Sequence, residues 1–347
     1  MDDYVTPYRR VFAAVQLSKI DRVPIVPQIT YTTSRISGLK FSEPMFDPNL
    51  MADALYRGYD RFEYDGIYVG WESSFNLMAE AMGCKLRIVE DANPSVVNKV
   101  VKDRGDLDNL SPPDPDVDGR LPVYIKAVDL LREKVKERVP LFSYVPGPLT
   151  LSGVIYGTDN LMLDILRNPD FVHDINRLSA RASENFAVAK AAHGVDVVVV
   201  AEPTASTSIL SRRMFKDFSY PYIRDIIRSI EKAGAIPSLH ICGKTDPILK
   251  DMVEAGAKIL EIDSLVDIKE AKASVGGKVC LMGNLDTTTL LTGEPSDVEL
   301  DVKDCIEKAA VDGGFILSSG CEVPLNTPIH NIRAMVQAAR KYGNYNS

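Results

Sequence analysis

The segment Asp196-Val197-Val198-Val199-Val200-Ala201-Glu202 carries the clearest fold signal in the chain, with four consecutive valines close to an acidic residue on each side. A strand that is buried on both faces has such an unbroken apolar run, because neither face needs polar side chains. Strands of this kind belong to parallel sheets that are covered by helices on their faces. The segment therefore predicts an α/β protein.

Seven more short apolar segments resemble this one, and helical patterns follow all eight along the chain. Eight such units predict a closed (β/α)8 TIM barrel, formed by residues 1–347 as a single domain. A doubly wound open sheet is the alternative, although no Gly-x-Gly-x-x-Gly follows the first strand to support it. The other predicted strands are Arg22–Pro27, Asp65–Gly70, Pro140–Val145, Ser238–Cys242, Ala257–Asp263, Lys278–Asn284 and Gly314–Ser319.

Residues 84–122 break this alternation. They contain possible strands at Lys85–Val89 and Val96–Val101, followed by the polar, proline-rich segment Ser111–Pro115. We interpret them as an insertion after the second strand of the barrel.

The composition limits the classes of function. The 347 residues are 45% hydrophobic and 25% charged, as in a soluble globular protein, and the net charge of -8 argues against a nucleic-acid surface. No apolar run approaches the roughly 20 residues of a membrane span, and the acidic N-terminus does not resemble a signal peptide. Five scattered cysteines argue against a disulfide framework and favour a reducing cytoplasm.

A candidate metal site combines the fifth and eighth predicted strands. His240 and Cys242 are two residues apart in a strand, so their side chains point the same way, and Cys321 follows the last strand. Chemistry in these barrels sits at the carboxyl ends of the strands. One nitrogen and two sulfurs suit zinc with an open position. The alternative is a core histidine with inert buried thiols.

Further polar residues end neighbouring strands. Glu202 is a candidate fourth ligand, a carboxylate that orients His240, or part of an ordinary hydrogen-bond network at the barrel mouth. Asp263 is a similar but weaker ligand candidate, and Asn284 ends the seventh strand; we predict catalytic roles for Glu202, Asp263 and Asn284. Glu261 shares a strand face with Asp263, so one of the two is a candidate for orienting the substrate.

Three aromatic residues lie just after or within the first three strands. Tyr31, Trp71 and Tyr144 are candidates for lining an aromatic substrate pocket. Core packing is the alternative role for Tyr144.

Several motifs are spread over nearly the whole chain: Thr6-Pro7-Tyr8-Arg9-Arg10-Val11, Asp21-Arg22-Val23-Pro24, Gly147-Pro148-Leu149-Thr150, His240-Ile241-Cys242-Gly243, Gly283-Asn284, Gly320-Cys321 and Thr327-Pro328. Together they resemble the uroporphyrinogen decarboxylase superfamily, and within it the corrinoid-dependent methyltransferase branch. That branch includes methylcobamide:coenzyme M methyltransferases and the first methyltransferases of anaerobic O-demethylase systems. The resemblance implies a barrel that holds zinc on His240, Cys242 and Cys321.

The implied chemistry is methyl transfer to or from a corrinoid. Zinc would act as a mild Lewis acid that binds a thiol as thiolate or coordinates the oxygen of a methyl ether. None of the four histidines lies in an Asp-x-His-x-x-Gly motif, so the corrinoid must be carried by a separate protein.

The leading hypothesis is a zinc-dependent methyltransferase that demethylates an O-methyl ether. Coenzyme M enzymes tend to carry Asp-Pro and Gly-Cys-Gly, whereas this chain has Glu202-Pro203 and Cys321-Glu322. The alternative is methyl transfer to a thiol such as coenzyme M. A uroporphyrinogen-type decarboxylase is a more distant alternative, because the arginine-rich stretch expected after Pro24 is missing. The least favoured alternative is a metal-binding accessory subunit of a corrinoid protein.

Overall fold

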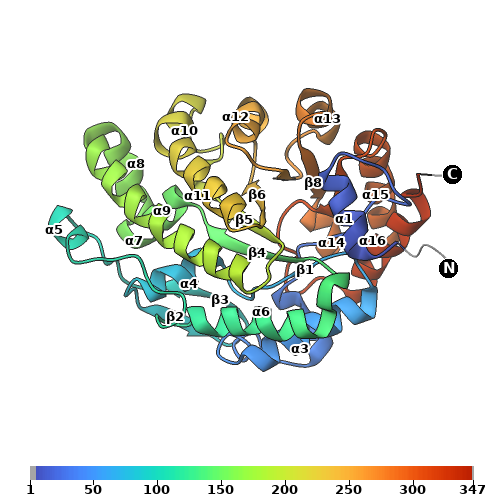
Figure 1. The fold of residues 1–347 in the computed structure, drawn as a ribbon, viewed down its shortest axis with the longest axis horizontal. Helices are drawn as coiled ribbons and strands as arrows, with labels where there is room; N and C mark the ends of the chain where they lie inside the picture. The colour runs from blue at the N-terminus through green and yellow to red at the C-terminus, as the bar shows by residue number, and fades with distance from the viewer. Residues whose placement is uncertain (1–4, 346–347) are drawn as a thin grey trace.

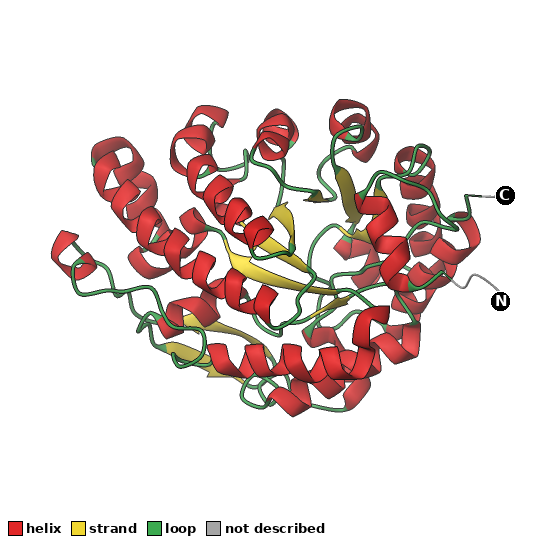
Figure 2. Ribbon diagram, viewed as in Figure 1, coloured by secondary structure: helices red, strands yellow, loops and turns green. Residues whose placement is uncertain are grey.

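The computed structural model describes residues 5–345. Seven parallel strands form one curled sheet with helices around its outside (Figures 1 and 2), in the order β1-β4-β5-β6-β7-β8-β9. The predicted α/β class with a parallel sheet is confirmed. The strands are β1 (Ile67–Tyr68), β4 (Leu141–Pro146), β5 (Val197–Ala201), β6 (Ile236–Ile241), β7 (Ile259–Ile262), β8 (Cys280–Leu285) and β9 (Phe315–Ser319).

The predicted first strand, Arg22–Pro27, does not form a strand of the sheet. It makes only an isolated parallel β-bridge, in which Ile25 pairs with Leu317. Leu317 N in β9 donates a hydrogen bond to Pro24 O, and Asp65 N before β1 donates to Ile25 O. The segment therefore lies between β9 and the start of β1, where the predicted barrel needs its closing strand. It does not form a longer ladder because Pro24 has no N–H to donate.

Helices follow most of the strands, and local sequence sets their starts. Asp47, for example, accepts hydrogen bonds from the backbone of Asn49 and Leu50, while Pro48 occupies the first position of α3. None of the helices within residues 5–345 is long and apolar enough to cross a membrane. The helices are α1 (Pro7–Val15), α2 (Ser34–Ser37), α3 (Pro48–Phe62), α4 (Ser74–Ala81), α5 (Arg104–Leu107), α6 (Leu121–Val135), α7 (Pro148–Tyr156), α8 (Thr158–Arg167), α9 (Pro169–Ala192), α10 (Arg212–Phe218), α11 (Tyr220–Lys232), α12 (Leu249–Glu254), α13 (Ile268–Val275), α14 (Thr287–Thr292), α15 (Pro295–Ala309) and α16 (Ile329–Tyr342).

Residues 84–122 contain a two-stranded antiparallel sheet outside the main sheet, formed by β2 (Leu86–Val89) and β3 (Ala92–Val96), and the short helix α5. The second strand of this small sheet is predicted at Val96–Val101, but β3 begins at Ala92 and ends at Val96, so the prediction is wrong by several residues. A two-residue turn returns the chain directly after β2, so the pairing starts earlier than the apolar residues indicate. That this segment is an insertion stays a prediction.

The four valines of β5 explain how the two layers of the core are built. Val197 and Val199 belong to a cluster inside the curled sheet, whereas Val198 and Val200 belong to the larger cluster between sheet and helices. All four are 0% exposed. The apolar run therefore reflects a strand that is buried on both of its faces.

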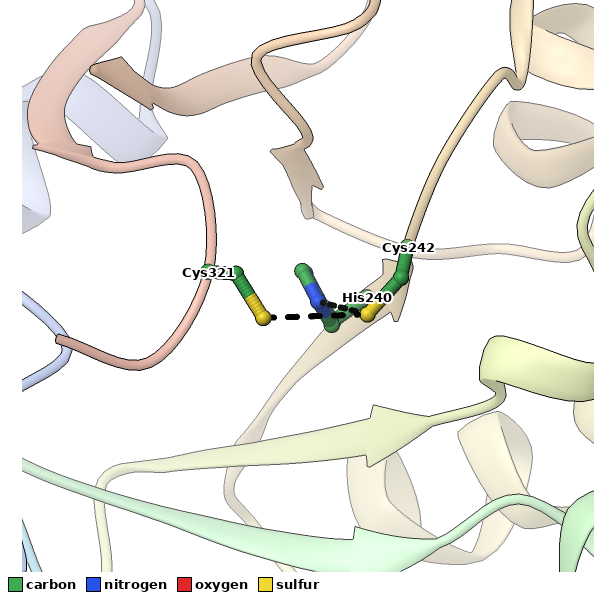
Figure 3. Close-up of side chains that lie close together, drawn as sticks. All are labelled: His240, Cys242 and Cys321. Carbon is green, nitrogen blue, oxygen red and sulfur yellow. Dashed lines mark hydrogen bonds between the residues drawn. The ribbon is translucent and has the colours of Figure 1, made fainter. Parts of the chain in front are cut away.

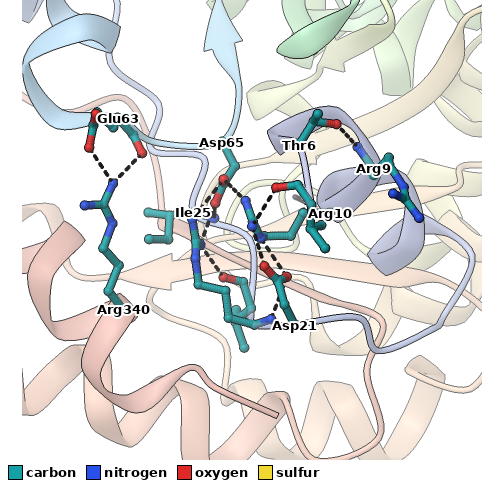
Figure 4. Close-up of polar contacts among 11 residues, drawn as sticks. Thr6, Arg9, Arg10, Asp21, Ile25, Glu63, Asp65 and Arg340 are labelled. Atoms are coloured by element: carbon teal, nitrogen blue, oxygen red, sulfur yellow. Dashed lines mark hydrogen bonds and ion pairs between the residues drawn. The ribbon is translucent and has the colours of Figure 1, made fainter. Parts of the chain in front are cut away.

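A buried ionic cluster anchors the N-terminal segment (Figure 4). The Asp65 carboxylate accepts hydrogen bonds from Arg10 Nη1 at 2.6 Å, Arg22 Nη1 at 2.7 Å and Ile25 N at 2.8 Å. Asp65 is only 1% exposed. It thus holds α1 and the segment after it against the start of β1.

Candidate metal centre

The three predicted zinc ligands lie together at the carboxyl ends of β6 and β9 (Figure 3). His240 is the penultimate residue of β6, Cys242 follows the strand directly, and Cys321 lies in the loop after β9. His240 Nε2 is 3.0 Å from Cys242 Sγ, which is 3.8 Å from Cys321 Sγ. The ligand atoms all lie within 4.8 Å of one another.

This arrangement fits a zinc ion. Two sulfurs that each lie about 2.3 Å from a tetrahedral zinc are about 3.8 Å apart, as the sulfurs of Cys242 and Cys321 are here. A disulfide would bring them to about 2 Å, and all five cysteines are free. His240 directs Nε2 at the thiols, while its Nδ1 is buried without a hydrogen-bond partner.

The electrostatics of the cluster favour a thiolate on one cysteine. The hydrogen bond between the two thiols lowers the pKa of Cys321 to about 4 and raises the pKa of Cys242. Burial lowers the pKa of His240, but the hydrogen bond to Cys321 and the charges of Cys321 and Glu261 outweigh it, so that the pKa is raised to about 9. The contacts between the two thiols thus favour the thiolate form of Cys321.

Glu261 on β7 lies behind His240. Its Oε2 is 3.8 Å from His240 Nδ1, and its Oε1 accepts hydrogen bonds from Tyr68 and Ser238. Burial raises the pKa of this carboxyl. Sequence reasoning identified Glu261 only as a neighbour of Asp263 on one strand face, because the partner of a buried carboxylate depends on which strands lie side by side.

Glu202 follows β5, and its backbone N donates a hydrogen bond to His240 O, but its side chain contacts the start of α7. Its Oε1 accepts a hydrogen bond from Thr150 N at 2.7 Å, and its Oε2 accepts from Leu149 N at 2.9 Å and Ser219 Oγ at 3.3 Å. Burial raises its pKa to about 7. Its role as a fourth ligand stays a prediction, since the structure does not bring it into the metal group.

A Gly147→Ala substitution should test the anchoring of Glu202. A Cβ at position 147 would lie 2.5 Å from Glu202 Cδ, so the carboxylate or the start of α7 must move. We expect a loss of about 1–3 kcal/mol in the free energy of unfolding, measured by urea denaturation. The control is Gly277→Ala, where a Cβ meets nothing within 4 Å. Equal stability of the two variants would show that Glu202 adapts without cost.

Asp263 and Asn284 support the loops beside the metal group. Asp263 Oδ2 accepts a hydrogen bond from Gly243 N at 2.8 Å, and Asn284 Nδ2 donates to Asp263 O and Val266 O. Neither residue is among those that line the cavity described below. Their catalytic roles stay predictions, and their contacts position the loops after β6 and β7.

The predicted aromatic residues and the predicted ligands line a single cavity of about 170 Å³. Tyr31, Trp71 and Tyr144 form part of its wall, together with His240, Cys242 and Cys321. Trp71 Nε1 donates to Phe41 O, and the Tyr144 hydroxyl donates to Gln28 Oε1, each at 2.7 Å. The rings are therefore held in place around a mostly apolar space that opens on the metal group.

Charged residues of the cavity wall that were not predicted to belong to the site include Glu322, which sequence reasoning noted only as the residue after Cys321, and Lys190. Glu322 accepts hydrogen bonds from Thr30 N and Oγ1, and burial raises its pKa to about 8. Lys190 on α9 is 2% exposed, and burial lowers its pKa to about 7. A signal existed for Lys190, because it follows Ser183, Phe186 and Ala187 on the buried stripe of its helix.

Comparisons with known proteins agree with the fold and the motifs. The model of the family described as uroporphyrinogen decarboxylase (URO-D) matches residues 6–342. A methylcobamide:CoM methyltransferase of Methanosarcina mazei is 29% identical, with 99% of each chain covered. A methylated-thiol–coenzyme M methyltransferase of the same organism is 28% identical, covering 97% of this chain and 90% of the relative. The solved structure of a methyltransferase from Methanosarcina mazei superposes with a TM-score of 0.89 at 25% identity, covering 98% and 99%.

Proposed function

The chain belongs to the uroporphyrinogen decarboxylase family, and from this premise we propose that it is a single-domain, zinc-dependent methyltransferase that passes a methyl group between a corrinoid protein and a thiol. The observation that carries the proposal is the His240, Cys242 and Cys321 group, which lies in the wall of a mostly apolar cavity with aromatic residues in its lining. An acceptor thiol in that cavity would have its sulfur beside the metal ligands.

The relatives favour a thiol over a methyl ether. The sequence motifs favoured an O-methyl ether because of Glu202-Pro203 and Glu322, but the similar proteins are named for coenzyme M and for methylated thiols. The preference for the ether is therefore replaced by the thiol alternative. The prediction of a corrinoid-dependent methyltransferase is supported by the same relatives.

The residues of this chain bind, orient and shield the substrate. Zinc on His240, Cys242 and Cys321 would supply the Lewis acidity that keeps a substrate thiol ionised near neutral pH. The carboxylate of Glu261 lies 3.8 Å from His240 Nδ1, on the side of the ring away from the thiols, and its charge favours the orientation in which Nε2 points at the thiols. Tyr31 and Trp71 contribute apolar surface to the cavity wall, which would leave an ionised sulfur beside them less solvated and more reactive.

The methyl donor must come from outside this chain. The corrinoid would be presented by a separate protein over the carboxyl ends of the strands, where the metal group lies. The test is to mix the zinc-loaded protein with methylcobalamin and a thiol and to follow the loss of the methyl–cobalt absorbance. We expect thiol-dependent demethylation in the wild type and none with Cys242→Ser. Turnover of methyl ethers with Co(I) corrinoid but none of thiols would contradict the proposal.

A Glu261→Gln substitution should weaken zinc binding. The amide keeps the shape of the side chain but removes the charge that lies 3.8 Å from His240 Nδ1. Losing such a partner of a metal-ligating histidine costs about 10- to 100-fold in metal affinity, and we expect the lower end of that range. Competition with a chromogenic chelator measures it. Unchanged zinc affinity would mean that Glu261 only packs beside the site.

A further inference from the structure

A buried lysine lines the cavity that opens on the metal group. Lys190 Nζ donates a hydrogen bond to Tyr144 O at 2.5 Å and lies 3.9 Å from the centroid of the Phe186 ring. A neutral lysine amine carries a lone pair that makes it a nucleophile, and donating to a carbonyl oxygen leaves that lone pair unused. The contact with Tyr144 therefore holds the amine at the cavity wall without blocking its reactive electron pair.

The surroundings of Lys190 favour the neutral amine. The ion pairs within residues 5–345 do not include Lys190, and burial is the sole cause that lowers its pKa to about 7. A buried ammonium group loses its hydration, and without a carboxylate partner nothing compensates for that loss. An ordinary lysine has a pKa of about 10.4 and is almost fully protonated at neutral pH. Lys190 thus has a much larger share of the nucleophilic form.

A second lysine shows that the cavity, and not burial alone, sets Lys190 apart. Burial also lowers the pKa of Lys272, whose Nζ donates hydrogen bonds to Gly313 O at 2.5 Å and Gly314 O at 3.4 Å. Lys272 does not belong to the lining of the cavity at the metal group. A small molecule in that cavity therefore meets Lys190 and not Lys272.

The cavity suits a small molecule with an apolar body and a carbonyl group. Its volume is about 170 Å³, and Val69, Trp71 and Leu77 contribute buried apolar side chains to its wall. Ser73 Oγ and Ser74 Oγ are buried without hydrogen-bond partners, and both residues belong to the same lining. A hydroxyl group is a hydrogen-bond donor that a carbonyl oxygen accepts. The wall thus combines apolar surface, unused donors and an amine.

We propose that Lys190 is a covalent capture site for small apolar aldehydes, which it binds as an imine. The lone pair of Nζ attacks the carbonyl carbon, a carbon–nitrogen double bond replaces the carbon–oxygen double bond, and the oxygen leaves as water with the two amine protons. The condensation changes no oxidation state and needs no other reactant. This inference goes beyond methyl transfer, and the captured aldehyde would occupy the space that opens on the metal group.

The experiment treats the full-length protein with benzaldehyde and sodium cyanoborohydride, which reduces an imine to a stable secondary amine. Mass spectrometry of peptides then measures the rate at which each lysine gains a benzyl group. Because more of its amine is neutral, we expect Lys190 to react at least about tenfold faster than the exposed lysines. Lys272 should react slowly, since it lies outside the cavity. In concentrated urea, where burial is lost, the preference for Lys190 should disappear.

Matched variants and a larger aldehyde provide the controls. Lys190→Met should remove the fast site, whereas Lys126→Met removes an exposed lysine on α6 and should keep it. The wild-type rates decide the matter by themselves if Lys190→Met does not fold. Pyrenecarboxaldehyde is too large for the cavity, so it should label the exposed lysines and spare Lys190.

Three results would overturn this inference. The first is labelling of Lys190 by benzaldehyde no faster than that of the exposed lysines. The second is an equal rate at Lys190 and Lys272, which would mean that the cavity gives no advantage. The third is fast labelling of Lys190 by pyrenecarboxaldehyde. Methyl transfer to thiols is measured by a separate assay, and its outcome is independent of all three.

Discussion

A Cys321→Ala variant should lose its zinc and its methyl transfer together. The wild type is expected to bind about one zinc per chain, held by ligands from two strands that are not neighbours in the sheet. Removing the ligand after β9 leaves only His240 and Cys242, and two protein ligands are too few to hold the zinc ion tightly. Losing a residue that only supports a metal ligand already lowers metal affinity or activity by about 10- to 100-fold. Because Cys321 is itself a ligand, we expect activity to fall by more than about a hundredfold. Elemental analysis and the methylcobalamin assay measure the two effects.

The matched control for this prediction is Cys84→Ala. Cys84 is buried but does not belong to the metal group, so that variant should retain full zinc content. The same zinc stoichiometry in Cys321→Ala and wild type would mean that the metal, if bound, is held elsewhere. Loss of activity with zinc retained would assign Cys321 a role other than that of a ligand.

An Asp65→Ala variant should lose about 3–5 kcal/mol of stability. It leaves Arg22 without a carboxylate, whereas Arg10 keeps its ion pair with Asp21. Removing one partner of a buried ion pair has this effect because the remaining charge is uncompensated. The substitution also frees Ile25 N, which now donates to Asp65. Urea denaturation of wild type and variant measures the difference.

The Glu63→Ala variant is the control, at an ion pair two residues earlier. Glu63 and Arg340 lie 3.3 Å apart, but their side chains are 71% and 42% exposed. An exposed pair contributes about 1 kcal/mol or less, so this change should be small. A similar small loss for Asp65→Ala would contradict the view that the buried cluster anchors the N-terminal segment.

Most of the fold could be predicted because a strand that is buried on both faces has an unbroken apolar run in the sequence. The valines of β5 and the apolar runs of the other strands needed no partner to be recognised. Arg22–Pro27 could not be placed as well, since its pairing depends on the distance between β9 and β1 and on the missing N–H of Pro24. The start of β3 likewise depends on a turn and not on hydrophobic pattern.

The ligand atoms of the candidate site were determined by the sequence alone. His240 and Cys242 point the same way because they are two residues apart along a strand, and Cys321 follows another strand of the same predicted sheet. Their meeting at the carboxyl ends of the strands therefore follows from the topology. Their neighbours depended on tertiary structure. Glu261 reaches His240 only because β6 and β7 pair, whereas Glu202 turns to the N-terminus of α7. Lys190 enters the cavity only because α9 packs beside β4. Burial there removes the water that would stabilise its charge, which lowers its pKa.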